Sequence, residues 1–243
     1  SSHESTSFLI NETNTIDAGN LLHSLAEDAA NLETVWLTHS HLDHIVDIAY
    51  ILDSFFNIRK KPLRIRGLPQ TLEAIQKYFL NDVIWPDFSK IPLLNSKEMT
   101  VVYESVKCGI EYRINETMSI EAMETIHTVP SCGYIVRKNS SAVLITADTY
   151  RNPGLCETIE KYPEIKALVL ECSFPSAMSK LALESLHLTP ALAEEEMSCI
   201  NRDIKLYFNH LKPSCIDEIK EEIASLPRLK DGIVLDDGDT IFF

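Results

Sequence analysis

A dense run of side chains that can bind metal lies near residue 40. The sequence H-S-H-L-D-H at positions 39–44 supplies His39, His41, Asp43 and His44, and it holds three of the eight histidines of the chain. Imidazole nitrogens and carboxylate oxygens are common ligands of divalent transition metals. The run lies between two apolar segments, where polar groups that bind nothing would be costly to bury. We therefore predict a metal site here rather than a polar surface turn.

The neighbouring segments predict how this run is presented. Residues 34–38 form an apolar strand pattern, and apolar residues recur at helical spacing from position 45 to position 56. His39 and His41 are two apart on an extended segment, so they project to the same side. Asp43 and His44 fall on the first helical turn and can face a second centre.

Three further candidate ligands each follow an apolar run later in the chain. His127 follows residues 123–126, Asp148 follows residues 144–147, and His210 follows residues 206–209. Any one of them alone reads as an ordinary residue at a strand end. The repetition of the pattern favours a common role, which would complete the shells of two metals.

The remaining segments predict a single mixed α/β domain over residues 1–243. We expect a hairpin at 7–17, helices at 20–30, 43–56 and 70–80, and a strand at 63–66. Five successive strands between 101 and 146 favour antiparallel pairing. Strands at 167–170, 205–208 and 232–235 then alternate with helices at 190–200 and 214–223, before a hairpin turned by Asp237-Gly238 into 240–243. Such a mixture suits two sheets packed face to face with helices outside.

The charge balance bears on the class of partner. Acidic residues outnumber basic ones by 36 to 22, which gives a formal net charge of -14. This charge would repel a long phosphate backbone, and the longest basic run, Arg59-Lys60-Lys61, is expected to be a solvated face. We therefore expect a small-molecule substrate and no long nucleic acid, and we leave a homodimer open.

Six cysteines are scattered singly without a C-x-x-C pair, and we predict that most are reduced core thiols. No stretch approaches the roughly 18 apolar residues of a membrane span. Residues 1–5 carry neither a starting Met nor an apolar signal core, so we expect a trimmed N-terminus. A cytoplasmic protein without membrane association is the first expectation, and a periplasmic or secreted one is the alternative.

The pattern H-x-H-x-D-H, followed by a strand-end His, a strand-end Asp and a final His, resembles the metallo-β-lactamase superfamily over nearly the whole chain. The resemblance implies an α/β (α+β) fold, the four-layer αββα sandwich. Asp17, in I-D-A-G, matches the early aspartate with which this superfamily orients a ligand histidine. The implied ligands are His39, His41 and His127 for one metal, Asp43, His44 and His210 for the other, and Asp148 between the two.

Shorter stretches are similar to the class II cyclic-nucleotide phosphodiesterases. They are S-T-S-F-L-I at 5–10, H-S-H-L-D-H-I at 39–45, E-C-S-F-P at 171–175, H-L-T-P at 187–190 and, more weakly, N-H-L-K-P at 209–213. The likeness implies hydrolysis of cAMP or cGMP to the 5′-monophosphate by a hydroxide that two metals activate. Two features depart from the family. Its glycine-rich segment before the first strand is absent, and Asp47 stands where a small residue is usual.

The expected chemistry also suits a phosphodiester on charge alone. Two divalent cations, two aspartates and a hydroxide leave about +1 at the centre, which matches a phosphodiester monoanion. The leaving 3′ oxygen needs a proton, for which His187 is the candidate acid, and Glu171 could hold its imidazole in the working tautomer. Together with Asp43 these are the predicted catalytic residues. The alternative is that Glu171 is a surface charge and His187 a loop histidine.

Several other functions remain open from the sequence. Zn is the first candidate metal and Fe or Mn are alternatives, because nitrogen and oxygen ligands admit all three. The same fold could serve an RNA 3′-end phosphodiesterase or a lactone or thioester hydrolase. A di-iron redox protein and a metal-binding scaffold without activity are further alternatives. The net charge counts against RNA, and no flavin-binding domain accompanies the chain.

Overall fold

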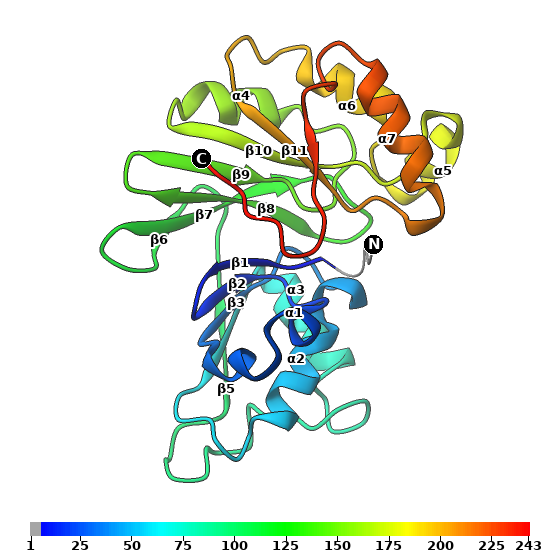
Figure 1. Ribbon diagram of the computed structural model, residues 1–243. Helices are drawn as coiled ribbons and strands as arrows, with labels where there is room; N and C mark the ends of the chain where they lie inside the picture. The colour runs from blue at the N-terminus through cyan, green and yellow to red at the C-terminus, as the bar shows by residue number, and fades with distance from the viewer. Residues whose placement is uncertain (1–5) are drawn as a thin grey trace. The chain divides into compact units, whose positions relative to one another are not determined.

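The computed structural model describes residues 6–243, which group into two compact units. The N-terminal unit extends to Lys107 and the C-terminal unit runs from Cys108 to Phe243. Each contains one β-sheet, its helices and its own hydrophobic core (Figure 1). Ser5, the first residue of the S-T-S-F-L-I stretch, lies outside the described residues. That both units form a single domain stays a prediction.

The N-terminal unit is built on a five-stranded sheet with the strand order β1-β2-β3-β4-β5. Strands β1 and β2 form the predicted hairpin, and β2 to β5 run parallel. The carboxyl ends of β2 and β3 therefore meet at one edge of the sheet, from which Asp17 and His39 follow. The elements are β1 (Phe8–Asn11), β2 (Asn14–Ile16), α1 (Leu21–Leu25), β3 (Thr34–Trp36), α2 (Leu42–Ser54), β4 (Leu63–Gly67), α3 (Pro69–Tyr78) and β5 (Val101–Ser105).

Helix α2 is fixed on this sheet by an apolar stripe. Ile48, Ile51 and Leu52 are fully buried and share a core cluster with Val35 of β3 and Ile65 of β4. Burial of each such side chain stabilises the fold by about 1.5–3 kcal/mol. The first turn of α2, which carries two candidate ligands, is thereby held against the end of β3.

The C-terminal unit is built on a seven-stranded sheet with the strand order β12-β11-β10-β9-β8-β7-β6. Neighbours from β6 to β9 are antiparallel, as predicted, and neighbours from β9 to β12 are parallel. The antiparallel expectation is wrong for the first of the five predicted strands, because β5 pairs in parallel with β4 in the other sheet. The strands are β6 (Glu111–Arg113), β7 (Met118–Thr125), β8 (Ser131–Lys138), β9 (Ser141–Ile145), β10 (Ile165–Glu171), β11 (Lys205–Asn209) and β12 (Ile233–Val234). The helices are α4 (Gly154–Lys161), α5 (Ser179–Ser185), α6 (Pro190–Met197) and α7 (Ile216–Ser225).

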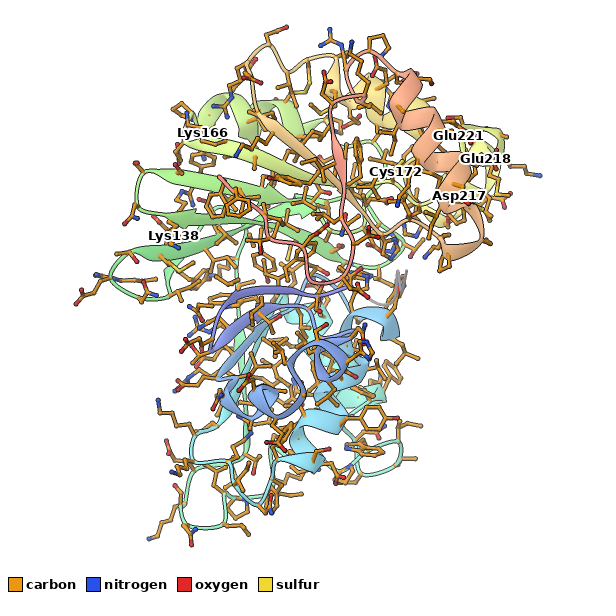
Figure 2. All side chains as sticks on the ribbon, in the orientation of Figure 1. Lys138, Lys166, Cys172, Asp217, Glu218 and Glu221 are labelled. Carbon is orange, nitrogen blue, oxygen red and sulfur yellow. A yellow bond between two sulfur atoms is a disulfide. The ribbon has the colours of Figure 1, made fainter. Side chains whose placement is uncertain are left out.

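Helix α7 shows how these helices cover their sheet. Ile219 and Ile223 are buried in the core, whereas Asp217, Glu218 and Glu221 are exposed on the other side of the helix (Figure 2). An apolar stripe opposite charged residues is the usual pattern of a surface helix. Among the described residues, no helix is both long enough and apolar enough to span a bilayer.

Three expectations about the elements need correction. The helix expected at 20–30 divides after Leu25, because Ala26 has a φ of 47° and the chain continues as the 3₁₀ helix Ala26–Asn31. Helices α4, with eight residues, and α5, with seven, were not predicted.

The expected C-terminal hairpin is wrong. Gly238 does adopt a left-handed turn conformation, with a φ of 89°, but residues 240–243 form no strand. The two-residue strand β12 pairs in parallel with β11 instead. The backbone N–H of Phe242 donates to the Tyr207 hydroxyl at 3.3 Å, so the last residues bind the side of β11 rather than β12.

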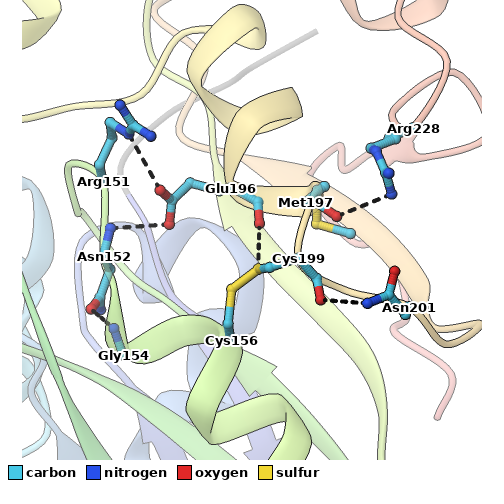
Figure 3. The surroundings of a disulfide bond; sticks show 9 residues. All are labelled: Arg151, Asn152, Gly154, Cys156, Glu196, Met197, Cys199, Asn201 and Arg228. Carbon is cyan, nitrogen blue, oxygen red and sulfur yellow. Dashed lines mark hydrogen bonds and ion pairs between the residues drawn. A yellow bond between two sulfur atoms is a disulfide. The ribbon is translucent and has the colours of Figure 1, made fainter.

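Four cysteines are thiols, as predicted for most of them, but Cys156 and Cys199 form a disulfide (Figure 3). The bond joins α4 to the turn after α6, and the Cα atoms are 6.1 Å apart. This separation is ordinary for a disulfide. The pairing was not predictable because the two residues are 43 positions apart in the sequence.

Candidate metal centre

The N-terminal unit brings its four predicted ligands together at the junction of β3 and α2. His39 is fully buried, His41 is the last residue before α2, and Asp43 and His44 lie in its first turn. Ligand atoms of His39 and His41 lie within 4.8 Å of one another. The Nε2 atom of His44 is 4.0 Å from a carboxylate oxygen of Asp43. Four side chains that the sequence places in one short run thus form a compact donor cluster.

Asp17 anchors this cluster from the end of β2. Its carboxylate lies 2.7 Å from Nδ1 of His44 and accepts hydrogen bonds from the Thr38 backbone N–H at 2.8 Å and the Thr38 hydroxyl at 2.7 Å. The Thr38 hydroxyl in turn lies 3.0 Å from Nδ1 of His39. Asp17 thus contacts His44 as predicted, and the role of His44 as a metal ligand stays a prediction. Burial raises its pKa, and the charge and hydrogen bond of His44 offset this only in part.

These contacts assign the tautomers of both imidazoles. A carboxylate accepts, so Nδ1 of His44 carries the proton that it donates to Asp17. The single proton of the Thr38 hydroxyl goes to Asp17, so its oxygen accepts from Nδ1 of His39. In both rings the lone pair is on Nε2, the nitrogen that can bind a metal.

The C-terminal unit forms a second donor cluster at the carboxyl ends of its strands. His127 follows β7, Asp148 follows β9 and His210 follows β11. The Nε2 atoms of His127 and His210 are 3.9 Å and 3.4 Å from the same Asp148 oxygen. One ligand atom each from Asp148, His187 and His210 lie within 4.8 Å of one another. The three predicted strand-end ligands are thus close together, as the shared pattern indicated.

Glu171 and His187 form a buried pair in this cluster. Glu171 ends β10, and its carboxylate lies 2.8 Å from Nδ1 of His187 and accepts from the Thr149 N–H at 3.2 Å. The His187 ring stacks on His210 with centroids 5.2 Å apart. Burial acts to lower the pKa of His187, but the hydrogen bond and charge of Glu171, with the charge of Asp148, raise it overall. Glu171 is therefore not the surface charge of the alternative; His187 does lie in a loop, but it is buried, and its role as the acid stays a prediction.

Two supporting groups were missed from the sequence. The Ser173 hydroxyl, fully buried, donates to Glu171 and lies 2.9 Å from Nδ1 of His210. The carbonyl oxygen of Leu186 lies 3.2 Å from Nδ1 of His127 and accepts its proton. A serine two residues after a strand-end glutamate gives only a weak signal, and a backbone carbonyl gives none.

Unusual backbone conformations gather at these clusters. Ala26, Asp82 and Asn139 lie elsewhere, but four of the seven described non-glycine residues with positive φ are Asp17, Ala147, Leu186 and His210, with φ between 54° and 61°. Each is a residue of the two clusters or the direct neighbour of one. Left-handed conformations of this kind cost about 1–3 kcal/mol each and persist where the surroundings over-determine them. These conformations therefore lower the stability of the fold, but they fix the direction of the side chains in both clusters.

Asp47, which departs from the family pattern, has a structural role. Its carboxylate accepts from the backbone N–H of Leu22 at 2.8 Å, and its own N–H donates to the Ala18 carbonyl at 2.9 Å. It therefore ties the first turn of α1 to α2, beside Asp17. Burial raises the pKa of Asp47, and its backbone hydrogen bonds lower it only in part.

The donors of both clusters suit a divalent transition metal. They combine imidazole nitrogens with carboxylate oxygens and contain no thiolate, and the imidazoles of His39, His44, His127 and His210 are each anchored through Nδ1. Such anchoring is the usual way in which proteins fix a ligand histidine. The fold and these clusters together indicate divalent metal binding.

Comparison with known proteins agrees with this chemistry. Residues 1–152 match the class-II cAMP phosphodiesterases, and the chain belongs to that family. It is 25% identical over 239 residues to 3′,5′-cyclic-nucleotide phosphodiesterase 1 of Saccharomyces cerevisiae, covering 88% of this chain and 62% of that protein. It is 22% identical over 195 residues to 3′,5′-cyclic-nucleotide phosphodiesterase of Schizosaccharomyces pombe, covering 72% of this chain and 53% of that one. The chain thus spans less than two thirds of either relative.

Solved structures identify the fold. The metallo-β-lactamase fold protein YhfI from Bacillus subtilis superposes with a TM-score of 0.71 at 19% identity, covering 95% of this chain and 88% of that one. Unliganded yeast PDE1 gives 0.71 at 21% identity, covering 86% and 68%. The short form of human tRNase Z gives 0.67 at 17% identity, covering 98% and 92%. The predicted metallo-β-lactamase fold is confirmed.

Proposed function

We propose that this chain is a metal-dependent phosphodiesterase that hydrolyses a 3′,5′-cyclic nucleotide to its 5′-monophosphate. The observation that carries the proposal is the family match over residues 1–152, which contains the whole N-terminal cluster. Both yeast relatives bear the name 3′,5′-cyclic-nucleotide phosphodiesterase. The buried Glu171–His187 pair adds a proton donor of the kind that ester cleavage requires.

The predicted ligands would hold two divalent cations. We assign the ligands as implied by the family pattern: His39, His41 and His127 for one ion, Asp43, His44 and His210 for the other, and Asp148 shared. Bound there, the ions would supply a hydroxide nucleophile near neutral pH and neutralise charge on the phosphoryl oxygens. Zn is our first candidate, and Fe and Mn are alternatives that elemental analysis of the purified chain distinguishes.

The chain's own residues supply the remaining steps. His187 donates its Nε2 proton to the departing 3′ oxygen, and its raised pKa favours the protonated imidazole that this step needs. Glu171 accepts from Nδ1 and so keeps Nε2 directed away from itself as the donor. Asp43 lies in the first turn of α2, so the helix would hold its carboxylate in place as a ligand.

One relative favours a second candidate. Nuclear ribonuclease Z of Triticum aestivum is 24% identical over 102 residues, which is 42% of this chain. RNA 3′-end cleavage is the same phosphodiester chemistry on a larger substrate. The net charge of -14 makes a long polyanion the less favourable substrate.

A substrate panel tests the proposal. The metal-analysed chain is incubated with cAMP, cGMP, a bis-aryl phosphodiester, an RNA with a 3′ trailer, a β-lactam, a lactone and a thioester. We expect preferential opening of a cyclic nucleotide, with the 5′-monophosphate as product. Turnover of the lactone or thioester alone, or of the RNA alone, would place the chain elsewhere in the superfamily.

Three alanine variants separate metal binding from proton transfer. We expect His41→Ala to lose metal and activity, and His187→Ala to keep its metal while kcat falls about 10²-fold or more. His23→Ala, an exposed histidine on α1, is the matched control and should retain both. Metal content and kcat are measured on the same preparations. Full activity in His187→Ala would remove its role as the acid.

The disulfide bears on the compartment. Disulfides persist in oxidising compartments and are rare in the cytosol. The Cys156–Cys199 bond therefore favours the periplasmic or secreted alternative over the cytoplasmic expectation. Counting thiols in denatured chain isolated without reductant tests the bond on which this depends, with four thiols expected for the bonded form.

A further inference from the structure

A single buried hydroxyl lies at the centre of the C-terminal cluster. The Ser173 Oγ atom is 2.9 Å from Glu171 Oε2, 2.9 Å from His210 Nδ1 and 3.2 Å from His187 Nδ1. Its residue is fully buried. The Ser173 backbone N–H donates to the Leu188 carbonyl, and its carbonyl accepts from the Lys212 N–H, each at 3.1 Å. Ser173 is thus held by the two segments that carry the histidines it contacts.

The single proton of this hydroxyl determines the tautomer of His210. A serine hydroxyl has one proton, and here that proton is donated to a carboxylate oxygen of Glu171. The Ser173 oxygen can therefore only accept from Nδ1 of His210. His210 then carries its proton on Nδ1 and its lone pair on Nε2, which lies 3.4 Å from Asp148.

The N-terminal cluster contains the same hydrogen-bonded arrangement of carboxylate, hydroxyl and imidazole. Thr38 donates its hydroxyl proton to Asp17 and accepts from Nδ1 of His39. Both hydroxyls are fully buried, and both connect a fully buried carboxylate to an imidazole that the carboxylate does not itself contact in the hydrogen bonds described. The two arrangements share no sequence and lie in different units, so the common element is the hydrogen-bond order carboxylate, hydroxyl, imidazole.

We infer that Ser173 is a positioning residue that selects the metal-binding tautomer of His210, by coupling that imidazole to Glu171. Through this hydroxyl, Glu171 supports two histidines at once, His187 directly and His210 indirectly. Removal of the hydroxyl takes this acceptor away from Nδ1 of His210, so the tautomer with the proton on Nε2 becomes more favourable, and that proton blocks the lone pair. The inference rests on the proposed function in one respect, the role of His210 as a metal ligand.

The tautomer itself is measured first, by ¹⁵N NMR of the histidine side chains in the full chain stripped of metal. We expect His210 to be protonated on Nδ1 in the wild type and to shift toward Nε2 protonation in Ser173→Ala. A wild-type His210 protonated on Nε2 would overturn the inference, whether or not any variant folds.

Metal affinity is the second measurement, made with Zn²⁺ by chelator competition. Loss of a group that orients a ligand weakens metal binding by about 10–100-fold, and we expect this for Ser173→Ala with recovery in Ser173→Thr, which keeps the hydroxyl. Thr100→Val is the control, because Thr100 is a fully buried hydroxyl that donates to the Ile91 carbonyl. It should leave Zn²⁺ affinity unchanged. Equal Zn²⁺ affinity in Ser173→Ala and wild type would contradict the inference.

The outcomes also separate this inference from the proposed function. If the His210 tautomer and the Zn²⁺ affinity change as expected but no cyclic nucleotide is cleaved, the positioning role stands and the activity is wrong. If cyclic nucleotides are cleaved while Ser173→Ala keeps the wild-type tautomer and Zn²⁺ affinity, the activity stands and the positioning role fails.

Discussion

The N-terminal and C-terminal clusters use one hydrogen-bonding scheme for two purposes. In each, a fully buried carboxylate contacts one imidazole directly and a second through a hydroxyl. Asp17 supports His44 and, through Thr38, His39, both of which we propose as metal ligands. Glu171 supports His210 through Ser173, but its direct partner, His187, is our proposed acid.

The two direct carboxylate–imidazole pairs, Asp17–His44 and Glu171–His187, differ in which group has a raised pKa. In the N-terminal cluster burial dominates, and the pKa of Asp17 itself is raised. In the C-terminal cluster the charges of Glu171 and Asp148 outweigh the burial of His187 and raise the pKa of the imidazole. In the roles that we propose, Asp17 orients a metal ligand, whereas Glu171 and the second anionic neighbour, Asp148, favour the protonated form of a proton donor.

Substitution of the two carboxylates should have the largest effects and should separate the clusters. We expect Asp17→Asn to weaken Zn²⁺ binding about 100-fold. The amide has one acceptor oxygen where the carboxylate has two, so its NH₂ group must face either the Thr38 backbone N–H or the Thr38 hydroxyl and His44. Glu171→Gln should weaken Zn²⁺ binding only about 10-fold, through His210, while kcat falls about 10²-fold through His187. Zn²⁺ competition and kcat are measured on both variants. Parallel losses of affinity and turnover in both would mean that the clusters do not differ.

The disulfide gives the next largest contrast, because all six cysteines belong to the C-terminal unit and residues 1–107 contain none. The bond links residues 43 positions apart and so lowers the conformational entropy of the unfolded chain, which should stabilise that unit by about 2–4 kcal/mol. We expect Cys156→Ser to lower the unfolding free energy in urea by this amount, and reductant to have the same effect on wild type. Cys108→Ser is the control and should respond to reductant as wild type does. Insensitivity of wild type to reductant would show that the bond adds no stability.

The smallest effect distinguishes Asp47 from Asp17, since only Asp17 faces an imidazole. The folded chain raises the pKa of Asp47 above 3.8, so its contribution to stability is fully present below that pH and is lost as pH rises through the folded pKa. Asp47→Asn keeps an oxygen that can accept from Leu22 and has no such loss. We therefore expect the variant to gain stability relative to wild type between about pH 4 and pH 7, measured by urea unfolding. A constant difference across this range would refute the assignment.

Local pattern predicted most of the elements and the N-terminal cluster, whereas the members of the C-terminal cluster came from the repeated strand-end pattern and the family resemblance. The strand at 34–36, the helix from 42 and the ligands between them are contiguous, so their geometry follows from strand and helix periodicity alone. The failures were also local in origin. The chain turns at Ala26 with a positive φ, and alanine gives no signal for that conformation. Strand β12 has only two residues, too few to form the expected hairpin.

The sequence by itself determined the types of donor, the position of the 39–44 run and the family, because these depend on residue identity and short spacing. Only the tertiary structure decided which groups support those donors. Ser173, Leu186 and the Cys156–Cys199 pair act across separations from 37 to 59 positions, where parallel strand ends and packed helices set the distances. Hydrogen-bond order depends on where each proton can go, and that is known only once donors and acceptors have been brought within reach of each other.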